Sequence, residues 1–202
     1  MKKSLGAQTL LYPSPAVAVG SYDTAGKPNV MAAAWVGLCS SRPPAVTVGI
    51  REACHTHAGI VEHQAFTLGI VPEHLVAELD YFGLASGARE DKFDVSGLTA
   101  VKSELVNAPY VTEFPVIVEC TLLKTFRVGI HTQFVGEILD VKADESVLDE
   151  EGRPDVDKVQ PICFIPDIRE YRGLGKRLAK AFSCGREVRR RKQGQDAEAT
   201  DS

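Results

Sequence analysis

Three polar side chains early in the chain could hold an anion together. Arg51 ends a strand-like run and can fork onto two oxygens, and the hydroxyls of Ser41 and Thr56 can donate hydrogen bonds. A short helix predicted to follow Arg51 would direct its unpaired backbone N–H groups at the same point. This composition indicates a phosphate pocket. A simpler interpretation stays open, in which Thr56 is the N-cap of that helix and Arg51 is a surface arginine.

A second feature is a shallow trough beside these residues. The stretch from Asn29, NVMAAAWV, is typical of a strand, but its middle is occupied by Ala32, Ala33 and Ala34. Alanine offers little side chain to its neighbours in a sheet, so a groove would remain beside Trp35, the single tryptophan of the chain. Either a flat ligand or a neighbouring element could fill the groove, and Trp35 could instead belong to the core.

The cysteines give no sign of a disulfide or zinc framework. Five of them are scattered along the chain without a CxxC pair, at positions 39, 54, 120, 163 and 184. We therefore expect most to be buried thiols that act as small apolar residues. This includes Cys39, although its place beside the alanine groove leaves a redox role open.

Other side chains carry weaker signals. Cys54, His55 and His57 are close in sequence, but their spacing matches no closed zinc motif, and we expect no metal. Tyr171 and Arg172 could close a ligand site or cap the last strand, and their types do not decide between these roles. We find no convincing catalytic triad.

The elements that must position these residues are mostly strands. Alternating or continuous apolar runs predict strands at residues 16–23, 45–50, 66–71, 115–129, 131–141 and 162–165. The runs at 45–50 and 66–71 each have one bulky and one small face. Short helices are expected at 55–64 and 73–83, and the acidic linker 143–158 is expected to be a surface loop or short helix. Hairpins without regular β-α-β alternation favour an antiparallel barrel over a doubly wound parallel sheet.

Composition limits the class of partner. The chain has 202 residues, 44% hydrophobic content and a net charge of -4, which favours small-molecule or protein partners over nucleic acid or membrane. We see neither a signal peptide nor a transmembrane run, so a cytoplasmic protein is expected. One domain should occupy residues 1–185, and residues 186–202 should form a polar, disordered tail.

Several separated motifs together resemble one family. They are N-x-M-x-x-x-W from Asn29, S-x-P-P from Ser41, a strand that ends in Arg51 before a His/Thr cluster, and G-x-R-E-D-K-F from Gly87 followed by G-L-T. In this combination the chain resembles the flavoredoxin branch of the flavin reductase-like family, from about Ser14 to Gly175. The resemblance implies a mainly β, antiparallel, FMN-binding split β-barrel with a few short helices. It also implies a homodimer in which each barrel completes the other's site.

The resemblance assigns the cofactor site residue by residue. Around the flavin ring it places Asn29, Met31, Ala32, Ala33, Ala34 and Trp35. Near the ribityl chain it places Ser40 and Ser41. Around the phosphate it places Arg51, His55 and Thr56, and it brings Lys92 to the cofactor from across the site. Small residues fit this role, because they let a planar ring lie against the backbone.

Two functions follow from the resemblance. The first is an oxidoreductase that passes hydride or electrons between NAD(P)H and flavin or another acceptor, with no catalytic side chain required. The second is an electron carrier of the flavoredoxin type, whose FMN is reduced by a partner protein. The sequence has no G-x-G-x-x-G after a strand, so a nicotinamide would have to stack on the flavin. Another planar ligand such as haem is a third alternative, although no histidine stands out as an axial ligand.

An apolar second face gives a separate reason to expect a dimer. In the long predicted hairpin, Val116, Val118, Cys120 and Leu122 lie on one face, whereas Ile117 and Leu123 lie on the other. One face suits a barrel interior, and the other suits a partner subunit.

Overall fold

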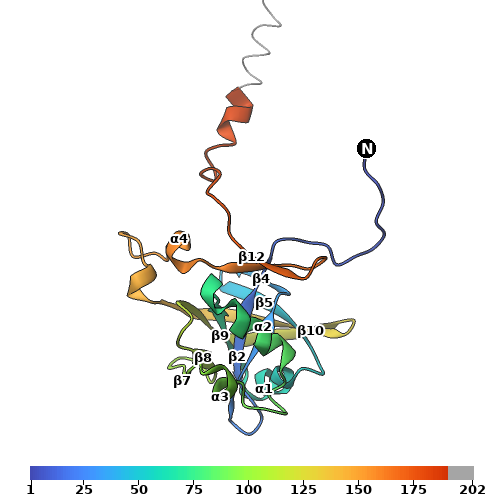
Figure 1. Cartoon of the computed structure of the whole chain (residues 1–202), viewed down its shortest axis with the longest axis vertical. Coiled ribbons are helices and arrows are strands. Elements are labelled where there is room, and N and C mark those ends of the chain that lie inside the picture. Colours follow the sequence, from blue (N-terminus) through green and yellow to red (C-terminus); the bar gives the residue numbers. More distant parts are fainter. Residues whose placement is uncertain (191–202) are drawn as a thin grey trace, which may run out of the picture.

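The computed structural model describes residues 1–190, so most of the polar tail predicted at 186–202 lies outside the described residues. The body is built on a seven-stranded sheet that contains both predicted hairpins (Figure 1). In spatial order its strands are β3 (Pro28–Ala33), β2 (Val17–Tyr22), β6 (Ala65–Ile70), β9 (Val116–Val128), β10 (His131–Ala143), β5 (Pro44–Arg51) and β4 (Val36–Ser41). All neighbouring strands are antiparallel, which confirms the predicted pairing.

The sheet curls around a core made by the bulky faces of its strands. Val48 and Ile50 of β5 pack with Phe66 of β6 and Phe134 of β10, all essentially inaccessible to solvent. Gly136 lies opposite Phe66, where a Cβ atom would come within 2.5 Å of the ring. On the small face of β6, a Cβ atom at Gly69 would lie 2.4 Å from the ring of Phe114, so the alternation of large and small residues there has a steric basis.

Helices cover the sheet at two places. Helix α1 (His55–His63) follows β5, and α2 (Val76–Leu84) follows β6 through the 3-10 turn η1 (Glu73–Leu75). Leu79 and Phe82 of α2 are buried in a second core with Val30 and Ile117, as their helical spacing predicts. A further short helix, α3 (Lys92–Ser96), begins at Asp91, whose carboxylate accepts backbone N–H bonds.

Smaller elements complete the body. The acidic linker contains η2 (Glu145–Val147) and α4 (Val156–Val159), which confirms the expected short helix. A three-stranded sheet has the order β1 (Ser14–Pro15), β11 (Ile162–Ile165), β12 (Glu170–Gly173), and a two-stranded one joins β7 (Ala100–Lys102) to β8 (Pro109–Val111). Of these five strands only β11 was predicted, because it alone has a continuous run of four apolar residues, ICFI, and the other four strands have neither such a run nor a clear alternation.

Two expectations about the segment from Asn29 are wrong. The segment is not one strand, because the chain leaves β3 after Ala33 and enters β4 at Val36. Cys39 is exposed on β4 rather than buried, since β4 is an edge strand. Among the five cysteines only Cys120 and Cys163 are buried. Apolar periodicity does not distinguish an edge strand from a central one.

Both ends of the chain run outside the body. Residues 1–13 and 174–190 are exposed throughout, and both segments leave on the side where β12 lies (Figure 1). They carry large apolar side chains that their own chain leaves uncovered. Phe182 is 99% exposed, Leu178 is 88% exposed and Leu11 is 82% exposed.

The contact of Gly136 with Phe66 gives a prediction for stability. Gly136→Ala should lower the free energy of unfolding by about 1–3 kcal/mol, because the added methyl meets a fully buried ring that cannot move aside. Gly37→Ala on β4 is the matched control, since a Cβ there has no neighbour within 4 Å. Urea denaturation of both variants measures the effect. An equal loss in the two variants would mean that strand conformation, not packing, sets the cost.

Candidate functional site

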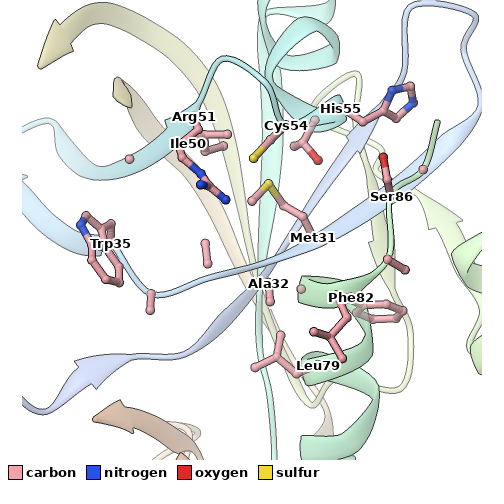
Figure 2. Close-up of a pocket in the computed structure, with 18 of the residues that line it drawn as sticks. Met31, Ala32, Trp35, Ile50, Arg51, Cys54, His55, Leu79, Phe82 and Ser86 are labelled. Atoms are coloured by element: carbon pink, nitrogen blue, oxygen red, sulfur yellow. The ribbon is translucent and has the colours of Figure 1, made fainter. Parts of the chain in front are cut away.

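A cavity of about 600 Å³ lies between β3, the end of β5, the start of α1 and the end of α2. Figure 2 shows that side chains from these segments converge on it. Its lining comes from Ala16, residues 31–35, 49–51, 53–56, 79 and 82–87, Lys92, Ile130, His131, Phe164 and Tyr171. Segments far apart in the sequence thus share one space of the size that small-molecule ligands occupy.

Most of the predicted cofactor residues meet in this cavity. Those that line it are Met31, Ala32, Ala33, Ala34, Trp35, Arg51, His55, Thr56 and Lys92. The alanine groove therefore forms a wall of the cavity. Trp35 belongs to the same wall and is 42% exposed, so it is not a core residue.

Three predicted residues lie elsewhere. Asn29 is buried behind the wall and does not line the cavity. Ser40 and Ser41 are exposed on β4, where they pair with Ala45 and Pro44 at the beginning of β5. Arg51 is at the opposite end of that strand, about 20 Å away at the usual rise of a strand. Within one chain, Ser41 and Arg51 therefore lie near opposite ends of β5 and not side by side.

The cavity is positively charged at one end. The Arg51 side chain points into it between Trp35 and Met31 (Figure 2). His55, Lys92 and His131 also line it, and none of the described lining residues is acidic. In a chain of net charge -4, this concentration of cationic and imidazole groups favours an anionic ligand.

Lys92 joins two walls of the cavity. Its side chain is buried, and Nζ donates to the backbone oxygens of Val30 on β3, at 2.8 Å, and Phe82 on α2, at 2.9 Å. Burial lowers the pKa of Lys92 to about 8. The amine thus fixes the separation of β3 and α2, and its third hydrogen has no recorded acceptor among the described residues.

The first turn of α1 forms the adjoining wall. Cys54 is the residue before the helix and makes no side-chain cap, so the prediction that Thr56 is the N-cap is wrong. Thr56 is buried in the first turn, where its Oγ1 accepts a 2.7 Å hydrogen bond from Nδ2 of Asn29. The predicted cap is absent because the helix begins at His55, which places Thr56 inside the first turn rather than before it. The start of the helix is therefore left without a side-chain acceptor for its N–H groups.

His55 is held from outside the cavity. Its Nε2 lies 3.5 Å from Oδ2 of Asp23 in the β2–β3 turn. Burial alone would raise the pKa of Asp23, but N–H bonds from Lys27 and Ala25, with the His55 contact, lower it overall. Asp23 is thus a fixed carboxylate behind the cationic end.

The other end of the cavity is apolar. Leu79, Phe82 and Phe164 line it together with the ring of Tyr171. The Tyr171 hydroxyl donates to Oδ1 of Asp80 at 3.1 Å, and burial, with Asp80, raises the pKa of Tyr171 to about 12. Tyr171 therefore contributes to the site, whereas Arg172 pairs with Glu170 on the surface at 2.7 Å and does not line it.

Sequence reasoning missed some lining residues. Ser86 and His131 are polar groups on the wall, and Figure 2 shows Ser86 directed toward the start of α1. His131 lies parallel to Trp35, with ring centroids 6.4 Å apart and 9° between the planes. The register of β10 with β5 places His131 opposite Arg51. Only that cross-strand pairing, which spans 80 residues, brings His131 into the site.

A metal site is not formed by the residues that suggested one. His57 contacts Oγ1 of Thr132 at 2.9 Å and packs edge-on against Phe134, away from Cys54 and His55. Within residues 1–190 no group of three or more His, Cys, Asp or Glu side chains could hold a metal ion. None of the helices in that range is long and apolar enough to cross a membrane.

Comparison with known proteins identifies the fold. The family model described as flavin reductase like domain matches residues 9–166. A solved flavoredoxin of Desulfovibrio vulgaris (Miyazaki F) is 52% identical, covers 92% of this chain and 100% of its own, and superposes with a TM-score of 0.88. A flavoredoxin from Methanosarcina acetivorans is 29% identical, covers 93% and 99%, and has a TM-score of 0.87. A ferric-chelate reductase (NAD(P)H) of Archaeoglobus fulgidus is 29% identical over 51% of this chain and 60% of its own.

The lowered pKa of Lys92 should make the unfolding free energy increase with pH between about 8 and 10.5. Its pKa is about 8 in the folded protein against an ordinary value of 10.5. Between these values the unfolded chain binds the proton more strongly, so stability rises with pH. We expect the difference in unfolding free energy, wild type minus Lys92→Met, to rise from pH 8 to pH 10.5 in urea titrations. Lys124→Met, at an exposed site on β9, is the control for the general effect of replacing a lysine by methionine. A flat difference for Lys92 would contradict its lowered pKa.

Proposed function

The chain belongs to the flavin reductase like domain family, and we propose that it is an FMN-binding oxidoreductase. It would pass hydride or electrons between NAD(P)H and flavin or another acceptor. One observation carries this proposal: the family's fold encloses a cavity that is cationic at one end, apolar at the other and free of acidic groups among its described lining residues. FMN has the same two-ended character, with a phosphate on one side and an aromatic ring system on the other.

The cationic end suits the phosphate. Arg51 reaches into the cavity and can fork onto two phosphate oxygens. Thr56 adds a hydroxyl, and the uncapped first turn of α1 adds backbone N–H groups with the positive end of the helix dipole. These groups would hold FMN by its phosphate without any metal.

The flat wall suits the ring. Ala32 and Ala33 on β3, with Ala34 after it, leave this wall free of bulk, and Leu79 and Phe82 of α2 extend the apolar surface beside Ala32. When bound, the flavin supplies the one- and two-electron chemistry that side chains lack. The chain's part is to bind and orient the cofactor and to exclude water from one side of it.

A second reactant could enter at the open rim. Trp35 and His131 are parallel aromatic groups that line the cavity beside Arg51. A nicotinamide or another planar acceptor can stack on such groups. This rim supports the use of NAD(P)H, and the ferric-chelate reductase (NAD(P)H) among the relatives fits it.

The second candidate function is an electron carrier reduced by a partner protein. The similarity to a flavoredoxin at 52% identity favours it. The two candidates share the cofactor site and differ in whether the protein itself oxidises NAD(P)H. Loss of absorbance at 340 nm with the FMN-loaded protein distinguishes them, since a carrier would consume no NAD(P)H without its partner.

We also propose a homodimer with FMN near the interface. Leu38 on β4 is 82% exposed, and Phe126, Val128 and Ile130 form an exposed apolar hairpin end on the body. Ile130 also lines the cavity, so a partner that covers the hairpin would lie beside the site. Terminal segments with exposed apolar residues provide further surface for a second copy to cover.

The cofactor assignment predicts selective binding of FMN. The wild-type protein should bind FMN more tightly than FAD, because no adenine site is evident in the sequence. Arg51→Ala should weaken FMN binding by about 1.5–3 kcal/mol and leave riboflavin binding nearly unchanged, since riboflavin has no phosphate. Fluorescence titration with the three flavins measures this.

A control variant and two further outcomes show whether Arg51 binds the phosphate or supports the fold. Arg153→Ala removes an exposed arginine that pairs with Asp149 outside the cavity, and it should change no flavin affinity. Equal weakening of FMN and riboflavin by Arg51→Ala would show that Arg51 supports the fold. Absence of flavin binding at micromolar protein would refute the proposed function.

If the protein is a homodimer, its mass in solution should remain that of two chains at low concentration. Sedimentation of the FMN-loaded protein at low micromolar concentration should give twice the 21.9 kDa of one chain. Leu38→Glu should shift it toward the monomer, because a charge would enter the apolar interface. Leu105→Glu, on an exposed loop between β7 and β8, should not. A wild-type mass of one chain would exclude an obligate dimer.

A further inference from the structure

Asn29 lies directly behind the cationic end of the cavity. It is 4% exposed, and Nδ2 donates to Oγ1 of Thr56 at 2.7 Å. Thr56 is 2% exposed and lines the cavity, whereas Asn29 does not. The family resemblance places Asn29 against the flavin ring, but the geometry places it one layer further from any ligand. Asn29 therefore contacts Thr56, and Thr56 in turn lines the cavity.

This contact decides what the Thr56 hydroxyl can do. A hydroxyl has one hydrogen to donate and two lone pairs to accept with. When Asn29 donates to it, one lone pair is occupied and the hydrogen stays available for another acceptor. No protein acceptor for that hydrogen is recorded among the described residues, and the cavity is the adjoining space. The Thr56 hydroxyl is thus set as a donor toward a ligand, the role an anion requires.

Tight packing holds Asn29 in this orientation. A Cβ atom on Gly87 would lie 2.2 Å from Oδ1 of Asn29 and 2.8 Å from Cδ2 of His55, so the loop after α2 presses against both residues. Asn29 sits in β3 opposite Ser21 of β2, which fixes its backbone. The side chain therefore has little freedom to leave Thr56, and the donor is ordered before any ligand arrives.

We propose that Asn29 is a positioning residue for phosphate recognition: it orients the Thr56 hydroxyl as a hydrogen-bond donor to the phosphate of FMN. This inference rests on the proposed function. It predicts that Asn29 contributes to the affinity for the FMN phosphate and not to the affinity for the flavin ring. Preorganisation of this kind strengthens binding because the ordering cost is met during folding.

The experiment compares FMN with riboflavin. Asn29→Leu keeps the branched shape and removes the donor, and it should weaken FMN binding about tenfold with little effect on riboflavin. Asn29→Ala serves as the second variant if the leucine protein does not fold. Ser21→Ala is the matched control, because Ser21 is fully buried opposite Asn29 but its hydroxyl has no hydrogen-bond partner within residues 1–190. That control should leave both affinities unchanged.

A double-mutant cycle tests the route through Thr56. In a Thr56→Val background, Asn29→Leu should have no further effect on FMN affinity, because the hydroxyl it orients is gone. In a Thr56→Ser background the tenfold loss should return. A merely structural role would give the same loss in all backgrounds.

The outcomes separate this inference from the proposed function. If the wild-type protein binds neither flavin, the function itself fails. If FMN binds selectively but Asn29→Leu weakens FMN and riboflavin equally, or acts additively with Thr56→Val, the positioning role is refuted and the FMN site stands.

Discussion

The site depends on one buried amine. Lys92 places its ammonium group between β3 and α2 and bonds a backbone oxygen on each. Desolvation of a charge is unfavourable, and the two carbonyl dipoles offset much of that cost. Because β3 carries the alanine wall and α2 carries Leu79 and Phe82, this contact holds two lining elements of the cavity against each other. Without it, two carbonyl oxygens at the site would lose their partner.

A second constraint fixes α1 against the same frame. Gly59 in the middle of α1 lies so close to the β2–β3 turn that a Cβ atom would be 2.0 Å from the backbone oxygen of Tyr22. His63, at the end of the helix, contacts the backbone oxygen of Asp23 at 2.7 Å. The helix is thus held at its middle and its end, and its first turn is presented to the cavity at a defined position. Glycine is required here by close approach and not by backbone conformation.

The two ends of this cavity are held in place by different interactions. Groups that would meet an anion are anchored from behind, as the Asn29–Thr56 and Asp23–His55 contacts show. Groups at the apolar end are anchored by packing, and the one hydroxyl there, on Tyr171, is turned toward Asp80. Such a cavity suits a flavin, and the parallel rings of Trp35 and His131 offer a planar surface in the same lining. Reductase and carrier chemistry would differ mainly at that surface.

The sequence by itself determined most strands of the seven-stranded sheet and the types of residue at the wall. Alternation in β5 and β6, the hairpin at Gly129–Ile130 and the alanines of β3 are local patterns, so they could be predicted without coordinates. The exposure of Cys39, the separation of Ser41 from Arg51 and the arrival of His131 and Tyr171 could not. These depend on strand order and register, which join residues far apart in the chain. Thr56 shows the difference most clearly: its type indicated a helix cap, but the helix begins one residue earlier and the Thr56 hydroxyl meets Asn29 of β3.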